Sequence, residues 1–140
     1  MLCYNDYDIN IIEKEKIMID IEKLDNATKL SYARLCLHSA KIYAETTDYE
    51  TALSWALESH RLYSACPVDE TVLREKGDCE VALIKISDMS RGREEALKFA
   101  RYACETYEQL VKIDPSESSK LSELKERRDK LETYINGLSR

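Results

Sequence analysis

Two histidines and five cysteines are the residues of this chain best suited to ligate a transition metal ion, and the cysteines could also act as nucleophiles. His38 lies two residues from Cys36, so the two side chains fall on different faces of a helix and are not spaced for metal binding. His60 is most simply a polar position on a helix. The sequence contains no phosphate-binding glycine loop, no HExxH motif and no nucleophile-elbow serine. We therefore expect no catalysis, no metal and no other cofactor.

The cysteines favour a reducing compartment. Their number is odd, their spacing is wide and no CxxC pair occurs, so we expect reduced thiols that act as small core residues in a nuclear or cytoplasmic protein. No signal peptide opens the chain, and no apolar run approaches the ~20 residues of a membrane span, so no membrane association is expected. The net charge of −6 argues against direct nucleic-acid binding and permits a basic protein partner. The five cysteines are Cys3, Cys36, Cys66, Cys79 and Cys104.

The composition predicts an all-α fold that forms one domain over residues 1–140. The chain is 44% hydrophobic and 34% charged, which is typical of a folded protein in water, and it has only three Gly and two Pro. A fold rich in strands would need more turn residues. We expect about six helices with short joins: an N-terminal helix over 9–24, a first helical hairpin over 26–66, a second over 69–114 and a closing helix over 115–138.

The first of these segments allows two interpretations. Ile17, Ile21 and Leu24 form a helical stripe, whereas Ile17, Ile19 and Ile21 alternate as in a strand. Isoleucine favours strands. We prefer a helix, because no other part of the chain offers a strand with which to pair.

Capping residues predict where the helices begin. Thr47 and Glu50 form a capping box at the start of a helix that must end before Pro67. The other predicted caps are Asp25 or Asn26, then Asp69, and then Asp114, the last with Pro115 at the first helical position and Glu117 completing a second capping box. The closing helix has an apolar seam at spacings of three and four, formed by Leu121, Leu124, Leu131, Ile135 and Leu138 with Arg128 among them.

An internal repeat relates the two predicted hairpins. A shift of 44 residues superimposes Ala52 on Ala96, and a period of this length indicates stacked supersecondary units. Gly77 interrupts a helix, so we expect a close contact or a slight bend there. Trp55 is either packed and half-buried or a partner-binding anchor. The same shift pairs Glu50 with Glu94, Leu53 with Leu97, Ala56 with Ala100, Tyr63 with Tyr107 and Ile42 with Ile86, and the expected buried face of the helix at 47–63 is Tyr49, Ala52, Leu53, Ala56 and Leu57.

These hairpins resemble units of the tetratricopeptide-repeat (TPR) superfamily with lengthened helices. In the first hairpin Ala40 stands at the family's very small position, Tyr43 at its Tyr position, Tyr49 at its aromatic near the turn and Ala52 at its helix-crossing Ala. The second hairpin keeps Ala96 and Ala103 but departs from the pattern with Ile84 and Ser87. The resemblance implies antiparallel hairpins with a C-terminal capping helix and a function in protein–protein interaction.

Within that superfamily, the chain is most similar to the C-terminal half of NASP-type (SHNi-TPR) histone chaperones. The similarity covers about residues 30–140 and includes a charged closing helix of the type LSELKERRDKLETYI. The chain has room for at most a partial first repeat and lacks the long acidic tract of those chaperones. The resemblance implies a reduced chaperone that binds histone H3 or H3–H4. The alternative is a scaffold or adaptor subunit docked within a larger complex.

The TPR resemblance also implies the binding residues. In such units the first helix of each hairpin lines a concave groove, which would hold a helical or basic segment of the partner. Acid on its rim, at Glu45, Asp48, Glu50, Asp78 and Glu80, favours the histone hypothesis. The expected partner-binding residues are Arg34, Leu37, Lys41 and Glu45 on one helix and Asp78, Val81, Lys85 and Met89 on the other.

Overall fold

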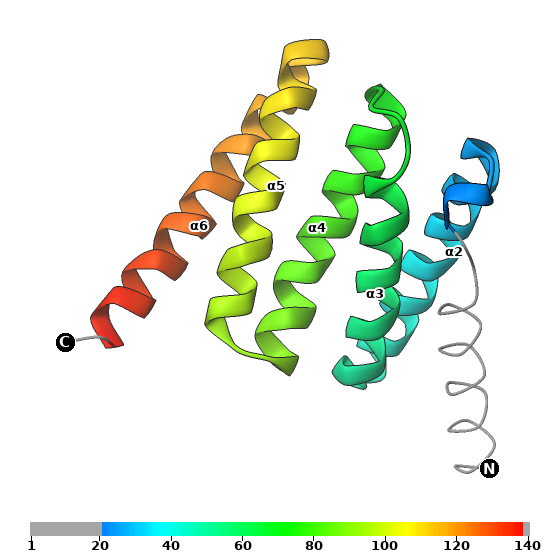
Figure 1. The fold of residues 1–140 in the computed structure, drawn as a ribbon. Helices are drawn as coiled ribbons and strands as arrows, with labels where there is room; N and C mark the ends of the chain where they lie inside the picture. Colours follow the sequence, from blue (N-terminus) through cyan, green and yellow to red (C-terminus); the bar gives the residue numbers. More distant parts are fainter. Residues whose placement is uncertain (1–20, 139–140) are drawn as a thin grey trace, which may run out of the picture.

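The computed structural model describes residues 21–138, which are helical throughout apart from short joins and contain no strand (Figure 1). Five α-helices lie in this part of the chain, at the places of the five helices expected after residue 24. Most of the segment expected as an N-terminal helix, 9–24, lies outside the described residues, and its end forms a 3-10 turn. The elements are η1 Ile21–Lys23, α2 Asn26–Glu45, α3 Tyr49–Ser64, α4 Glu70–Ser90, α5 Arg93–Ile113, η2 Pro115–Glu117 and α6 Ser118–Leu138.

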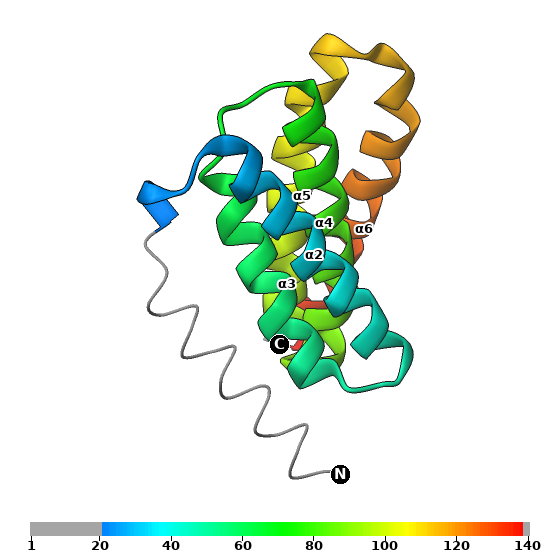
Figure 2. The same cartoon turned by 90° about the vertical axis from the view of Figure 1, so that its right-hand side faces the viewer.

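Successive helices run antiparallel and pack side by side in chain order, from α2 at one end to α6 at the other (Figure 1). The hairpin α2–α3 stacks on the hairpin α4–α5 through contacts of α3 with α4 and of α2 with α4. Figure 2 shows the same stack from its α2 end, with α3 and α4 behind α2. Between residues 21 and 138 no helix has the length and apolar character needed to cross a membrane. The all-helical, repeat-like architecture is therefore confirmed.

Asp25 and Asp69 are confirmed as helix caps, whereas the prediction for Thr47 is wrong. Asp25 accepts a hydrogen bond from the backbone N–H of Thr28, and Asp69 caps α4 in the same way. Asp48, not Thr47, caps α3 by accepting from Thr51 N. Thr47 instead takes a left-handed φ of 61° in the tight turn, which leaves its hydroxyl beside the Thr46 carbonyl.

The glutamates of both predicted capping boxes bind elsewhere. Glu50 forms an ion pair with Arg91 at 3.0 Å, so it ties α3 to the turn after α4. Asp114 does cap η2, by accepting from Ser116 N at 3.1 Å. Glu117 forms an ion pair with Arg74 at 2.7 Å instead of turning back to the cap. In both cases a cation from elsewhere in the chain is the stronger partner for a carboxylate than a single backbone N–H.

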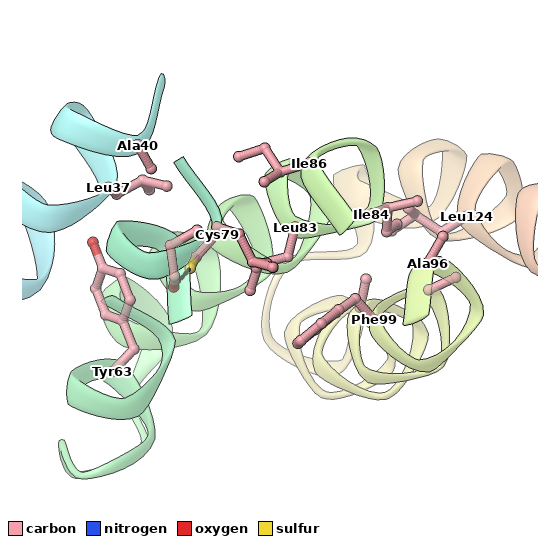
Figure 3. Close-up of a cluster of buried hydrophobic side chains, with 14 of the residues drawn as sticks. Leu37, Ala40, Tyr63, Cys79, Leu83, Ile84, Ile86, Ala96, Phe99 and Leu124 are labelled. Carbon is pink, nitrogen blue, oxygen red and sulfur yellow. Dashed lines mark hydrogen bonds between the residues drawn. The ribbon is translucent and has the colours of Figure 1, made fainter. Parts of the chain in front are cut away.

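The 44-residue shift pairs alanines that are buried in both hairpins. Ala52 and Ala96 are both fully buried, as are Ala56 and Ala100, which is the close helix packing that small side chains allow. The core continues from Leu37 and Ala40 of α2 past Leu83 of α4 to Phe99 of α5 (Figure 3). Trp55 is half-buried against it.

Two apolar side chains are more exposed than the repeat and the predicted buried face indicate. Ile42 is 47% exposed although its counterpart Ile86 is only 2% exposed. Leu57, assigned to the buried face of α3, is 43% exposed. The difference between Ile42 and Ile86 follows from position in the stack. A helix precedes and covers α4, whereas no described helix precedes α2.

Gly77 confirms the expected close contact. A β-carbon at this position would lie 2.7 Å from Cε2 of Tyr107 and 3.2 Å from its Cδ2. The ring of Tyr107 therefore packs directly on the backbone of α4. At the corresponding point of the first hairpin the hydroxyl of Ser59 donates to the carbonyl of Ala33 at 2.8 Å, so α3 is in close contact with α2 there.

Helix α6 closes the stack on α5. Leu124 and Leu131 of its seam are buried, and Leu121 and Ile135 are half-buried against the core. Leu138, at the end of the helix, is 71% exposed and does not extend the seam. The opposite side of α6 is polar and charged, as the terminal element of a helical stack requires.

Candidate protein-binding groove

A hollow of about 510 Å³ lies where α2 and α4 run next to each other. We call it the groove. Its walls are side chains of these two helices, its floor includes rings from α3 and α5, and η2 closes one end. The lining residues are Arg34, Leu37, His38 and Lys41 of α2, Tyr63 of α3, Arg74, Glu75 and Asp78 of α4, Tyr107 of α5 and Glu117 of η2.

One wall is built on Glu75. The guanidinium of Arg34 donates to both of its carboxylate oxygens, through Nε and Nη2, each at 2.7 Å. The hydroxyl of Tyr63 also donates to it, at 3.0 Å. The hydrogen bond from Arg34, followed by that from Tyr63, holds the pKa of Glu75 below its ordinary value. This bidentate arrangement fixes the spacing of α2 and α4 with defined geometry.

One further ion pair and one group of three charged residues lie at the groove. Lys41 of α2 and Asp78 of α4 lie 2.9 Å apart and are both about half exposed. At the other end Arg74 binds Glu117 at 2.7 Å and Asp114 at 3.0 Å. The hydrogen bond to Asp114, followed by that to Glu117, raises the pKa of Arg74 above its ordinary value. The cations of the groove are therefore already neutralised by carboxylates of the same chain.

The floor of the groove is apolar and aromatic. Leu37, Tyr63 and Tyr107 are 7%, 1% and 7% exposed, so their inner surfaces belong to the core and their edges face the groove. Burial, and then the negative charge of Glu75, raise the pKa of Tyr63 well above its ordinary value. Burial likewise raises the pKa of Tyr107. Both phenols therefore stay protonated, and that of Tyr63 donates its proton to Glu75.

The structure brings together half of the expected binding residues. Arg34, Leu37, Lys41 and Asp78 line the groove. The others do not line it: Glu45, Lys85 and Met89 are exposed further along α2 and α4, and Val81 is half-buried against the core.

The two tyrosines of the floor and the residues at one end of the groove were not among the expected binding residues. The internal repeat pairs Tyr63 with Tyr107, which is the one sequence signal that could have placed both rings at equivalent sites. Arg74, Glu75 and Glu117 join the groove through pairing between helices, and periodicity within one helix carries no signal for such pairing.

The predicted acidic rim is wrong at Glu80. Glu80 is 1% exposed and points away from the groove. Glu50 is paired with Arg91, and Asp78 with Lys41. Asp48 accepts the backbone bond that caps α3. The rim therefore does not present a continuous run of free carboxylates.

On the opposite side of the molecule, Glu80 is the centre of a buried polar network. Thr106 of α5 donates to its Oε1 at 2.5 Å, and Nε2 of His60 on α3 lies 2.7 Å from its Oε2. Because the carboxylate only accepts, Nε2 of His60 carries the proton. The His60 ring stacks on Tyr102 with centroids 5.8 Å apart. His60 thus joins three helices rather than being a simple polar surface position.

The cysteines behave as the sequence predicts. Cys36, Cys66, Cys79 and Cys104 are buried thiols, and Cys3 lies outside the described residues. Burial raises the pKa of the Cys79 thiol to about 12, so this side chain is a small apolar core residue. Among residues 21–138 no three His, Cys, Asp or Glu side chains are grouped to hold a metal ion.

Comparison of the chain with models of protein families, with curated proteins and with solved structures finds no match.

Proposed function

We propose that the protein is a non-catalytic protein-binding module of the TPR type whose groove accepts an apolar-anchored helical segment of a partner. The observation that carries this proposal is the apolar floor of Leu37, Tyr63 and Tyr107 beneath walls of charged residues. Protein-binding sites combine such aromatic or aliphatic pockets with a polar rim.

The TPR assignment is supported by three features. The two hairpins follow the 44-residue shift, and fully buried alanines stand at 52 and 96, the positions at which such units cross. The first helices of the two hairpins, α2 and α4, meet along one side of the stack, and the groove lies on that side.

The size of the groove limits what enters it. A volume of about 510 Å³ is that of a small-ligand cleft and cannot enclose a helix. One or two large apolar side chains of a partner helix fill it, while the body of that helix lies across α2 and α4. This is the helix-in-groove mode, in which a few anchors at helical spacing provide most of the affinity.

The charges of the groove set specificity more than affinity. Three cations, Arg34, Lys41 and Arg74, face three carboxylates, those of Glu75, Asp78 and Glu117, so the walls have no net formal charge. A partner helix with both signs on its flanks fits such walls, and binding should depend weakly on salt. This mode does not need the continuous acidic surface that a purely basic partner would favour.

A histone H3 or H3–H4 partner is the sharper form of the proposal. It is supported by the resemblance of residues 30–140 to NASP-type chaperones and by the overall charge of −6. The buried position of Glu80 weighs against it. The buried cysteine thiols support a nuclear or cytoplasmic site of action.

Titration of the full chain with histone H3–H4, followed by fluorescence anisotropy, tests this form. Lysozyme serves as an unrelated basic protein. Asp78→Lys, at a side chain that is 56% exposed, adds positive charge to the groove wall and should weaken H3–H4 binding at least tenfold. Glu105→Lys on the exposed surface of α5 is the matched control and should leave it unchanged.

Equal affinity for lysozyme and H3–H4 would reduce the interaction to nonspecific charge attraction. No binding of H3–H4 would remove the histone and leave the groove proposal to other helical partners. Equal loss in the Asp78 and Glu105 variants would move the histone site away from the groove.

A further inference from the structure

The side of α2 that faces away from the rest of the stack is free of charged residues. In a chain with 34% charged residues, an exposed helix face would normally carry several of them. Leu35 is 57% exposed and Ile42 is 47% exposed at the middle of this surface. We call it the outer face of α2. It consists of Thr28, Ser31, Leu35, Ser39 and Ile42 with the C-cap Thr46, at spacings of three and four.

In the second hairpin, the equivalent face packs against another helix. The 44-residue shift maps the outer face of α2 onto one side of α4, where four of the six equivalent residues form core. Those four are Val72, Cys79, Leu83 and Ile86, which are 5%, 0%, 0% and 2% exposed.

Helix α3 is what covers this side of α4. The thiol of Cys79 lies 3.6 Å from the carbonyl oxygen of Ala56, so the two helices are in close contact at their centre. The remaining two equivalent residues bind α3 at its ends. Glu75 accepts a hydrogen bond from the hydroxyl of Tyr63, and the hydroxyl of Ser90 donates to Glu50 at 2.9 Å.

The outward sides of the two end helices, α6 and α2, differ in charge. The outward side of α6 carries alternating charges, at Lys125, Glu126, Asp129 and Lys130, and needs no further cover. Repeat stacks require such a polar cap at each end that meets water. The outer face of α2 carries no such charges, although it has the length and register of an internal helix–helix interface.

We propose that the outer face of α2 is a docking surface for one amphipathic helix of a partner protein. The packing of α3 on α4 indicates the chemistry of this partner helix. The helix carries an uncharged stripe with small residues one turn apart, as Ala52 and Ala56 are in α3. A second copy of this chain does not provide it, because its α3 is buried between α2 and α4, its α6 is charged on the outside, and its own outer face of α2 has the large Leu35 one turn from Ser31 instead of a second small residue. The partner helix extends the stack by one layer. This site is separate from the groove and suits the scaffold alternative.

A stapled helical peptide with the sequence of residues 47–66, labelled with a fluorophore, is the probe. Anisotropy with the full chain should show saturable binding that changes little between low and high salt, since the outer face of α2 is uncharged. Leu35→Glu should weaken binding at least tenfold, because it places a carboxylate in the uncharged centre. Leu57→Glu, at a leucine of similar exposure on α3, should not change it. Circular dichroism confirms that both variants are folded.

Absence of saturable binding would overturn the proposal, and so would equal losses in the Leu35 and Leu57 variants. Binding that appears only after removal of residues 1–20 would show that the chain itself occupies the face, which overturns the assignment to a separate partner. Lys41→Glu, a groove variant, should bind the peptide normally. Failure at this face therefore leaves the groove proposal untouched.

Discussion

Substitution of Gly77 by Ala sets two effects of similar size against each other. Glycine inside a helix costs about 1 kcal/mol relative to alanine, so the replacement alone would stabilise α4. The added β-carbon, however, would lie 2.7 Å from Cε2 and 3.2 Å from Cδ2 of Tyr107, and 3.4 Å from Cγ2 of Thr106. The first two distances are shorter than ordinary van der Waals contact.

The environment decides which effect is larger. Tyr107 is only 7% exposed, so its ring can move away from an added β-carbon only toward the groove that it lines. Overpacking of this kind costs about 1–3 kcal/mol. Set against the gain of about 1 kcal/mol in helix propensity, we expect Gly77→Ala to lower the free energy of unfolding by up to about 2 kcal/mol. It should also narrow the groove.

A double-mutant cycle with Tyr107→Leu separates the two effects. Leucine removes the ring edge, so Gly77→Ala in that background should show only the favourable helix term. Urea unfolding of the four proteins should give a coupling energy of about 1–3 kcal/mol between the two positions. Gly137→Ala on α6 is the control, because a β-carbon there meets nothing within 4 Å, and it should be neutral or slightly stabilising.

A coupling energy near zero would refute the reasoning. So would a Gly77→Ala protein as stable as the Gly137→Ala protein. Either result would mean that Tyr107 does not rest on the α4 backbone and that the floor of the groove is placed differently.

Three further substitutions test other parts of the structure. Ala96→Leu at the buried crossing of α4 and α5 should cost about 1–3 kcal/mol in urea unfolding, whereas Ala27→Leu on the surface of α2 should cost little. His60→Ala leaves the buried carboxylate of Glu80 with one partner fewer and should destabilise by about 1–3 kcal/mol, with His60→Gln restoring part of the loss. Arg34 lowers the pKa of Glu75 in the folded state. The ion pair therefore adds to the free energy of unfolding above the ordinary pKa of 4.5, and this stabilisation is lost as pH falls through the lowered pKa. Glu75→Gln should therefore lower the free energy of unfolding at neutral pH and leave a flatter loss below about pH 5, in urea unfolding at a series of pH values.

The parts of the fold that periodicity and repetition determine were predictable from the sequence. The 44-residue shift placed Ala52 and Ala96 correctly in the core because both hairpins bury the same face. The cap Asp69 was predictable because it directly precedes a clear helix, whereas for α2 the sequence offered both Asp25 and Asn26, of which Asp25 is the cap.

Choices between neighbouring candidates were not predictable. Thr47 and Asp48 can each cap a helix, and the turn decided between them by placing Thr47 at a left-handed φ. Ile42 and Ile86 are equivalent in the repeat, yet their exposure differs because only α4 has a described helix stacked before it.

Pairs between helices were invisible to sequence reasoning. Glu80 looked like a surface acid because charged residues are almost never fully buried unless they are paired. Its partners His60 and Thr106 lie 20 and 26 residues away and come from two other helices. The groove has the same origin, since Glu75 is assembled with Arg34 and Tyr63 only after the hairpins stack.

The central claim is that the groove between α2 and α4 holds a partner helix by an apolar anchor. The most direct measurement selects binders to the full chain from a library of amphipathic helical peptides and maps the best one by amide chemical shifts. We expect saturable shifts around Leu37, Lys41 and Asp78, with affinity lost in Leu37→Glu and kept in Leu57→Glu. Shifts confined to the α5–α6 end, or full affinity for a folded Leu37→Glu protein, would contradict it.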